Sequence, residues 1–229
     1  MLSTKRKARD GWYPARALLP VQLRLNTQPT LEKYLSQRAW HSATLPCCPI
    51  DGAGCRPRRH GCYWRKFPCP TPIARFYCPR ARTTFSLLPD CFSSRYRGEL
   101  AEIEQVCVAA ESGADSLSVC NTLRSVDSAV NITARSAARW VGRRCALMAI
   151  VLRALLGVAI EQVEGVRTAT QLRARLHSAE ALVAMRAIIA PDLGSLPPPL
   201  GFGPWPNRER NTPNQVPHAM APEPDAPSG

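Results

Sequence analysis

The residues whose type and spacing most directly suggest chemistry are the cysteines. The chain has ten of them, and seven fall between residues 47 and 91. Thiolates are preferred ligands of Zn²⁺, and cysteines crowded together in a cytosolic chain indicate metal binding before disulfide bonding. We therefore predict a zinc site in this window. The other three, Cys107, Cys120 and Cys145, stand at apolar helical positions and are expected to be small buried side chains.

The spacing of the cysteines follows a zinc ribbon incompletely. Such a ribbon has two C-x2-C knuckles joined by a β-hairpin. Asp51 stands where a second ligand would follow Cys48, and Ala81, which cannot ligate, stands at the matching position after Cys78. Cys48, Cys55 and Cys78 are the expected ligands. The fourth is open among Asp51 in the first knuckle, Cys47, His60 and Cys69, and the alternative is a ribbon that folds without metal.

Cationic and aromatic side chains alternate around these cysteines, in the pattern of a surface that follows phosphates and stacks on bases. Residues 46–97 carry ten basic and two acidic side chains, and charges of one sign at this density repel unless a polyanion neutralises them. The alternative is a solvated basic hairpin with core aromatics. The predicted nucleic-acid contacts here are Arg58, Arg59, Tyr63, Trp64, Arg65, Lys66 and Arg75.

A second basic set lies on the helix expected over residues 133–144, TARSAARWVGRR. Thr133 is a good N-cap, because its hydroxyl can accept from a free backbone N–H of the first turn. Arg135, Arg139 and Arg143 recur at steps of four and therefore project from one side of this helix. The stretch 98–132 before it carries one basic and six acidic side chains, so the positive charge forms two separate areas.

Two shorter helices are expected before this basic helix, over residues 98–111 and 116–124. The segment 99–145 thus has the order of a helix-turn-helix, whose last helix enters the major groove of DNA. The join at 125–131 is longer than the usual tight turn, and an ordinary basic surface helix is the alternative. The predicted contacts are Arg135, Ser136 and Arg139 at base edges and Arg143 and Arg144 at phosphates.

The pattern of apolar residues along the chain predicts an α+β fold, whose elements must position these residues. Alternating, aromatic-rich runs at 63–67 and 73–78 predict a β-hairpin, and the run at 83–88 predicts a third strand. A short helix is expected within 30–38, capped by Thr30, and two further helices over 148–163 and 178–189. The expected units are a basic, weakly structured arm at 1–45, a zinc-ribbon-like module at 46–97, a helical domain at 98–192 and a disordered Pro-rich tail at 193–229.

Four fragments resemble a known group of proteins: HGCYWRK (60–66), IARFYCP (73–79), TTFSLLPDC (83–91) and AARWVGRR (137–144). They are similar to poorly characterised bacterial proteins with a zinc ribbon and a helix-turn-helix, which themselves resemble the DNA-binding N-terminal part of insertion-sequence transposases. The resemblance covers roughly residues 45–145. It implies DNA binding linked to a mobile element, as an accessory protein or regulator, and it implies no catalysis.

Several classes of protein are not expected. A two-metal nuclease needs carboxylates on separate strands, whereas the acids between Asp127 and Asp192 all fall on predicted helices, so we predict no enzyme. The apolar run at 145–160 has Arg153 at its middle, which favours a buried helix over a membrane span. The charge of +13 favours DNA as the partner of a cytoplasmic, nucleoid-associated protein. A homodimer through residues 146–190, or a non-catalytic interaction module, is the alternative function.

Overall fold

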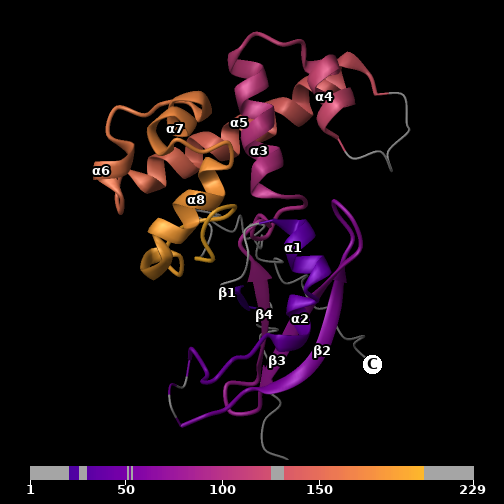
Figure 1. The fold of residues 1–229 in the computed structure, drawn as a ribbon, viewed down its shortest axis with the longest axis vertical. Coiled ribbons are helices and arrows are strands. Elements are labelled where there is room, and N and C mark those ends of the chain that lie inside the picture. Colours follow the sequence, from indigo (N-terminus) through magenta and orange to yellow (C-terminus); the bar gives the residue numbers. More distant parts are fainter. Residues whose placement is uncertain (1–20, 26–29, 51, 53, 125–131, 204–229) are drawn as a thin grey trace, which may run out of the picture.

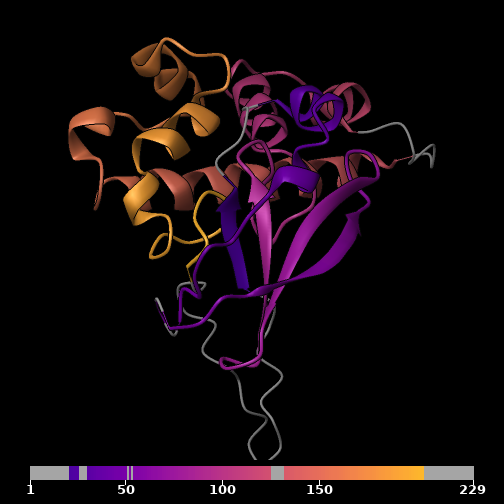
Figure 2. The same cartoon turned by 60° about the horizontal axis from the view of Figure 1, so that its bottom comes forward.

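The computed structural model describes residues 21–25, 30–50, 52, 54–124 and 132–203. It confirms the α+β class: a four-stranded sheet with helices gathered at one of its ends (Figures 1 and 2). Two predictions, the ligand Asp51 and the loop at 125–131, lie outside the described residues, as does the expected tail from residue 204 onward.

The sheet contains the predicted hairpin, the predicted third strand and one further strand. Its order is β1-β4-β3-β2, with β1 parallel to β4 and the other pairs antiparallel. The added strand falls within residues 1–45, where a weakly structured arm was expected. Its apolar positions alternate, but five residues form a stable strand only when a partner distant in sequence pairs with them. The strands are β1 (Val21–Leu25), β2 (Arg58–Arg65), β3 (Thr71–Cys78) and β4 (Thr83–Pro89).

A bulge in β2 decides which side chains share a face of the sheet. The pairing shifts between Arg59 and Cys62, where Gly61 adopts a φ of 74°, a backbone conformation that favours glycine. Cross-strand partners project from the same face. One face packs as a hydrophobic cluster against the segment 39–55, and its buried members include Phe76, Cys78, Phe85 and Leu87.

Two short helices, α1 (Leu31–Ser36) and α2 (Ala39–Ser42), run beside β2 and β3 (Figure 1). The predicted cap of α1 is confirmed, because Thr30 Oγ1 accepts from the backbone N–H of Lys33 at 3.3 Å. Tyr34 is fully buried, and its hydroxyl donates to the carbonyl oxygen of Pro72 at 2.8 Å. This bond ties α1 to the start of β3.

Three helices form the expected unit after the sheet, α3 (Leu100–Glu111), α4 (Ser116–Leu123) and α5 (Ala134–Leu155). A small apolar cluster of Val106, Val119 and Val141 joins them. Thr133 caps α5 as predicted. The prediction of separate helices at 133–144 and 148–163 was wrong: nothing between them breaks a helix, so α5 continues to Leu155.

Acidic side chains of α3 cap the helices that follow. Glu104 is fully buried and accepts from the backbone N–H groups of Ala181 and Leu182 at 3.1 and 2.9 Å. Glu111 likewise accepts from Ala169 and Thr170, at 2.7 and 2.9 Å. Carboxylates satisfy the free donors of a helix N-terminus and its positive dipole. Glu104 thus caps α8 (Ala181–Ile188), and Glu111 caps the unpredicted α7 (Ala169–Leu176). The short helix α6 (Ile160–Val163) precedes them, and a 3-10 turn at Ala190–Asp192 follows.

Residues 193–203 belong to the folded core, which corrects the expected start of the Pro-rich tail. Leu196, Leu200 and Phe202 are buried in the main hydrophobic cluster. Arg186 is fully buried and donates to the carbonyl oxygens of Leu200, at 2.9 and 2.7 Å, and Asp90, at 2.9 Å. Its guanidinium satisfies acceptors in a segment where prolines supply no N–H donors of their own. Burial lowers the pKa of Arg186 to about 10.

Candidate metal centre and nucleic-acid interface

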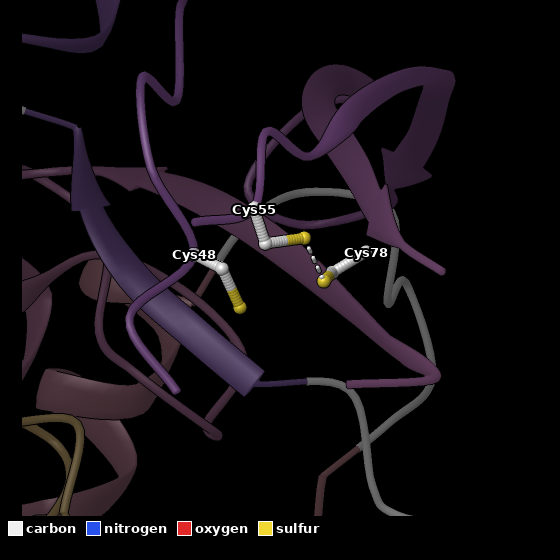
Figure 3. Close-up of side chains that lie close together, drawn as sticks. All are labelled: Cys48, Cys55 and Cys78. Carbon is white, nitrogen blue, oxygen red and sulfur yellow. Dashed lines mark hydrogen bonds between the residues drawn. The ribbon is translucent and has the colours of Figure 1, made fainter. Parts of the chain in front are cut away.

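Three of the predicted ligands come together on the packed face of the sheet. The Sγ atoms of Cys48, Cys55 and Cys78 lie within 4.8 Å of one another, and all three residues are buried (Figure 3). Cys55 Sγ and Cys78 Sγ are 2.8 Å apart. Three buried, convergent thiols could hold a metal ion, and soft donors of this kind suit Zn²⁺.

Backbone hydrogen bonds hold the segments that carry these thiols. The N–H of Cys48 donates to the carbonyl oxygen of Cys55 at 3.1 Å, which closes the first knuckle. Arg80 Nη1 donates to the carbonyl oxygen of Gly54 at 3.0 Å, which joins the two knuckles. The N–H of Ala81 donates to Cys78 Sγ at 3.3 Å. Ala81 cannot ligate, yet its backbone stabilises charge on the sulfur of a neighbour that can.

Three of the candidate fourth ligands are described, and none belongs to this cluster. Cys47 is exposed. The His60 ring stacks near the Tyr77 ring, with 6.0 Å between centroids. Cys69 contacts Thr71 at the opposite end of β3 from Cys78. Within the described part of the chain, the convergent donors are therefore the three cysteines.

The opposite face of the hairpin carries cations and aromatic rings side by side. We call Arg58, His60, Tyr63, Arg75 and Tyr77 the sheet surface. Tyr77 pairs with Arg58 across the strands and is 37% exposed, and Arg58 and His60 are exposed. The guanidinium of Arg75 lies 6.0 Å from the centre of the Tyr63 ring, and its buried Nε has no hydrogen-bond partner.

Two predicted contact residues of the hairpin, Arg59 and Arg65, also make contacts within the chain. Arg59 lies on the packed face, over the Phe76 ring, and donates to the carbonyl oxygen of Ala43 at 3.1 Å. Arg65 lies over the Phe92 ring and donates to the carbonyl oxygens of Ser93 and Gly98 at 3.0 and 2.9 Å. Burial lowers the pKa of Arg65. Arg59 nevertheless remains exposed, and both arginines stay predicted nucleic-acid contacts.

The end of the hairpin presents the remaining predicted contacts, Trp64 and Lys66. Trp64 is 65% exposed, and Lys66 is exposed as well. Tyr63 is half-buried against the main cluster, and its burial raises the pKa of the hydroxyl. An exposed indole beside a lysine is available for stacking on a base.

Helix α5 presents the second predicted surface. Arg135, Arg139 and Arg143, which we call the arginine row, are exposed, and none pairs with a described carboxylate. Ser136 takes part in the cap, because its hydroxyl accepts from Thr133 Oγ1 at 3.0 Å. This cap fixes the first turn of α5, which carries Arg135.

Arg144 does not extend this row. Its guanidinium stacks on the Trp140 ring, 3.6 Å from the centroid, and forms an ion pair with Glu102 at 2.6 Å. Arg144 thus links α3 to α5, and its phosphate contact stays a prediction. Sequence spacing places Arg144 next to Arg143, but it cannot show which carboxylate the tertiary fold brings close.

The comparisons with known proteins add no relative: no family model, curated protein or solved structure matches this chain. No described helix is long and apolar enough to cross a membrane.

Most large apolar side chains between residues 146 and 190 pack inside the chain, among them Leu152, Leu172 and Met185. The predicted homodimer remains untested.

Proposed function

We propose that this chain is a non-catalytic DNA-binding protein that uses two surfaces, the sheet surface and the arginine row. One observation carries the proposal: among the described residues, no arginine of either surface forms an ion pair, and the three acids of α3 are engaged elsewhere. Glu102 pairs with Arg144, and Glu104 and Glu111 cap α8 and α7. The exposed guanidinium groups therefore keep their charge without an internal counterion, which favours a polyanionic partner.

The two surfaces suit different parts of a nucleic acid. Rings beside cations on a strand face favour stacking on unpaired bases while guanidinium groups follow the backbone. A row of arginines on one side of a helix suits the edges and phosphates of a major groove. The role beside a mobile element rests only on the sequence resemblance of residues 60–66, 73–79, 83–91 and 137–144, since no family model, curated protein or solved structure matches this chain.

A zinc ion on Cys48, Cys55 and Cys78 belongs to this proposal as a structural brace. When bound, it would crosslink the segment 48–55 to the end of β3, whose Tyr77 lies on the opposite face. Small β-modules bury too little apolar surface to hold such loops firmly, and metal binding supplies the missing free energy. The metal would thereby set the position of the sheet surface without contacting the DNA.

A second candidate function rests on a different observation. Leu156, Ile160 and Ile188 are exposed by 47%, 59% and 48%, all within residues 146–190. Exposed apolar side chains favour association with a protein partner or a second copy when they gather in one patch. In this alternative the chain is an interaction or dimerisation module, and its basic charge serves solubility.

The proposal is tested by gel shift on the full chain, with a duplex and a single strand of the same sequence. The row variant replaces Arg135, Arg139 and Arg143 by alanine, and the sheet variant replaces Arg58 and Arg75. The charge-matched control replaces Arg153, Arg167 and Arg175, which are exposed outside both surfaces. We expect the row variant to weaken duplex binding, the sheet variant to weaken single-strand binding, and the control to bind like wild type. Equal losses in all three variants would contradict two defined surfaces.

A further inference from the structure

A cavity of about 660 Å³ opens between α5, the end of α4 and two loops of the sheet module. Phe67 and Pro68 contribute from the turn between β2 and β3, and Tyr96 to Gly98 from the segment before α3. Its size lies within the range of about 300–1,000 Å³ that is usual for small-molecule sites. The cavity adjoins the arginine row, because Arg143 lines it.

The charges that line this cavity are strongly one-sided. Four arginines face a single carboxylate, that of Glu102, which is already paired with Arg144. The other three guanidinium groups, those of Arg97, Arg124 and Arg143, form no ion pair with a described residue. Cations that line one cavity repel one another, so an anionic ligand that neutralises them is favoured.

The remaining walls are apolar and aromatic. Ile103, Leu147 and Ile150 contribute aliphatic surface from α3 and α5, and the rings of Phe67 and Trp140 stand at the edges. The guanidinium of Arg97 lies 5.4 Å from the centroid of the Phe67 ring, and that of Arg144 lies 3.6 Å from the centroid of the Trp140 ring. Planar guanidinium groups thus already lie against aromatic rings in this cavity. A ligand that matches both parts has a flat aromatic ring and an anionic group attached to it.

We propose that this cavity binds a nucleotide, with the base between the aromatic and aliphatic walls and the phosphate at Arg97, Arg124 and Arg143. This inference rests on the proposed function, since Arg143 also belongs to the surface that faces DNA. A free nucleotide and an unstacked nucleotide within a bound strand offer the same chemistry. In the second case the cavity takes a base out of the strand that lies along α5.

The test uses calorimetry on the full chain, with AMP as the free-nucleotide probe and ribose 5-phosphate as the probe without a base. One variant, Arg97→Ala with Arg124→Ala, removes the phosphate partners. A second, Ala146→Trp, fills the cavity from the wall of α5. Their controls are Arg153→Ala with Arg167→Ala, and Ala149→Trp, an exposed position on the same helix outside the cavity. Thermal melting of each variant checks that it folds.

A parallel arm follows a single-stranded oligonucleotide that contains one 2-aminopurine, whose fluorescence rises when the base leaves its stack. AMP binding that falls at least tenfold in both cavity variants, and not in the controls, supports a site for free nucleotides. A fluorescence rise that Ala146→Trp abolishes, without AMP binding, supports the site for a base within a strand. Equal affinity for AMP and ribose 5-phosphate, or neither signal while the strand still binds, overturns the cavity proposal alone. Failure of wild type to bind any nucleic acid overturns the proposed function as well.

Discussion

Arg144 donates two hydrogen bonds to a single carboxylate oxygen of Glu102, from Nε at 2.9 Å and from Nη2 at 2.6 Å. This pair links α3 to α5 and neutralises the one arginine of the 135–144 segment that lies closest to an acid. We expect Glu102→Gln to release the charge of Arg144 and to strengthen DNA binding severalfold at low salt. Stability should fall by about 1 kcal/mol, because the pair is only partly exposed. Weaker DNA binding by this variant would count against the role assigned to the pair.

Glu104 is expected to be the acid whose loss costs most stability. Its carboxylate pairs with Arg173 and accepts from two backbone N–H groups of α8, all in a buried position. Glu104→Ala should lower the free energy of unfolding by roughly 3–5 kcal/mol, since it leaves a charge and two donors without partners. Gln105→Ala, at the exposed neighbouring position of the same helix, should change it by less than about 0.5 kcal/mol. Urea denaturation of both variants measures the difference, and equal midpoints would contradict the capping role.

Zinc content checks the cysteine cluster. Protein purified from zinc-replete medium should contain close to one zinc per chain, and Cys55→Ser or Cys78→Ser should remove most of it. Cys62→Ser, which alters an exposed thiol outside the cluster, is the matched control and should keep the metal. A chelator should lower the melting temperature of wild type, because ligands held in the folded state couple metal binding to folding. Metal-free wild-type protein from the same medium would rule out the zinc brace.

Thiol reactivity and alkaline stability check the burial of Cys91. Burial raises the pKa of this thiol from 9.0 to about 12. Because the folded-state value exceeds the unfolded one, the stabilisation is fully present below pH 9 and is lost as the pH rises toward 12. We expect the free energy of unfolding to fall across this window. Iodoacetamide at pH 8 should label the exposed Cys47 and Cys62 well before Cys91. Comparable labelling rates, read by mass spectrometry, would contradict the burial.

Local signals predicted the parts of the fold that depend on local chemistry. Alternation of apolar residues predicted the β2–β3 hairpin, and the hydroxyls of Thr30 and Thr133 predicted two helix starts. The strand β1 and the folded segment 193–203 were missed. Both are stable only through partners far away in sequence, β4 for the first and Arg186 for the second.

The same contrast between local signals and contacts distant in sequence applies to the candidate site. Cys48, Cys55 and Cys78 were predicted because knuckle spacing is a local property, and the fold brings their sulfurs together. Arg59 and Arg65 were predicted as nucleic-acid contacts from the alternation of cations and aromatic residues, which does not show the contacts that they make within the chain. Their acceptors are carbonyl groups of distant loops, and no residue type in the sequence reveals a carbonyl that a guanidinium will reach.

The salt dependence of duplex binding tests the central proposal most directly. The affinity of wild type should fall linearly on a plot of log K against log salt between 50 and 200 mM, as phosphate contacts release counterions. Replacing Arg135, Arg139 and Arg143 by alanine should make that slope shallower by up to about 3, because each phosphate contact contributes about 0.9. The charge-matched control at Arg153, Arg167 and Arg175 should keep the wild-type slope. Affinity that does not change with salt, or identical slopes for all three proteins, would contradict DNA binding through the arginine row.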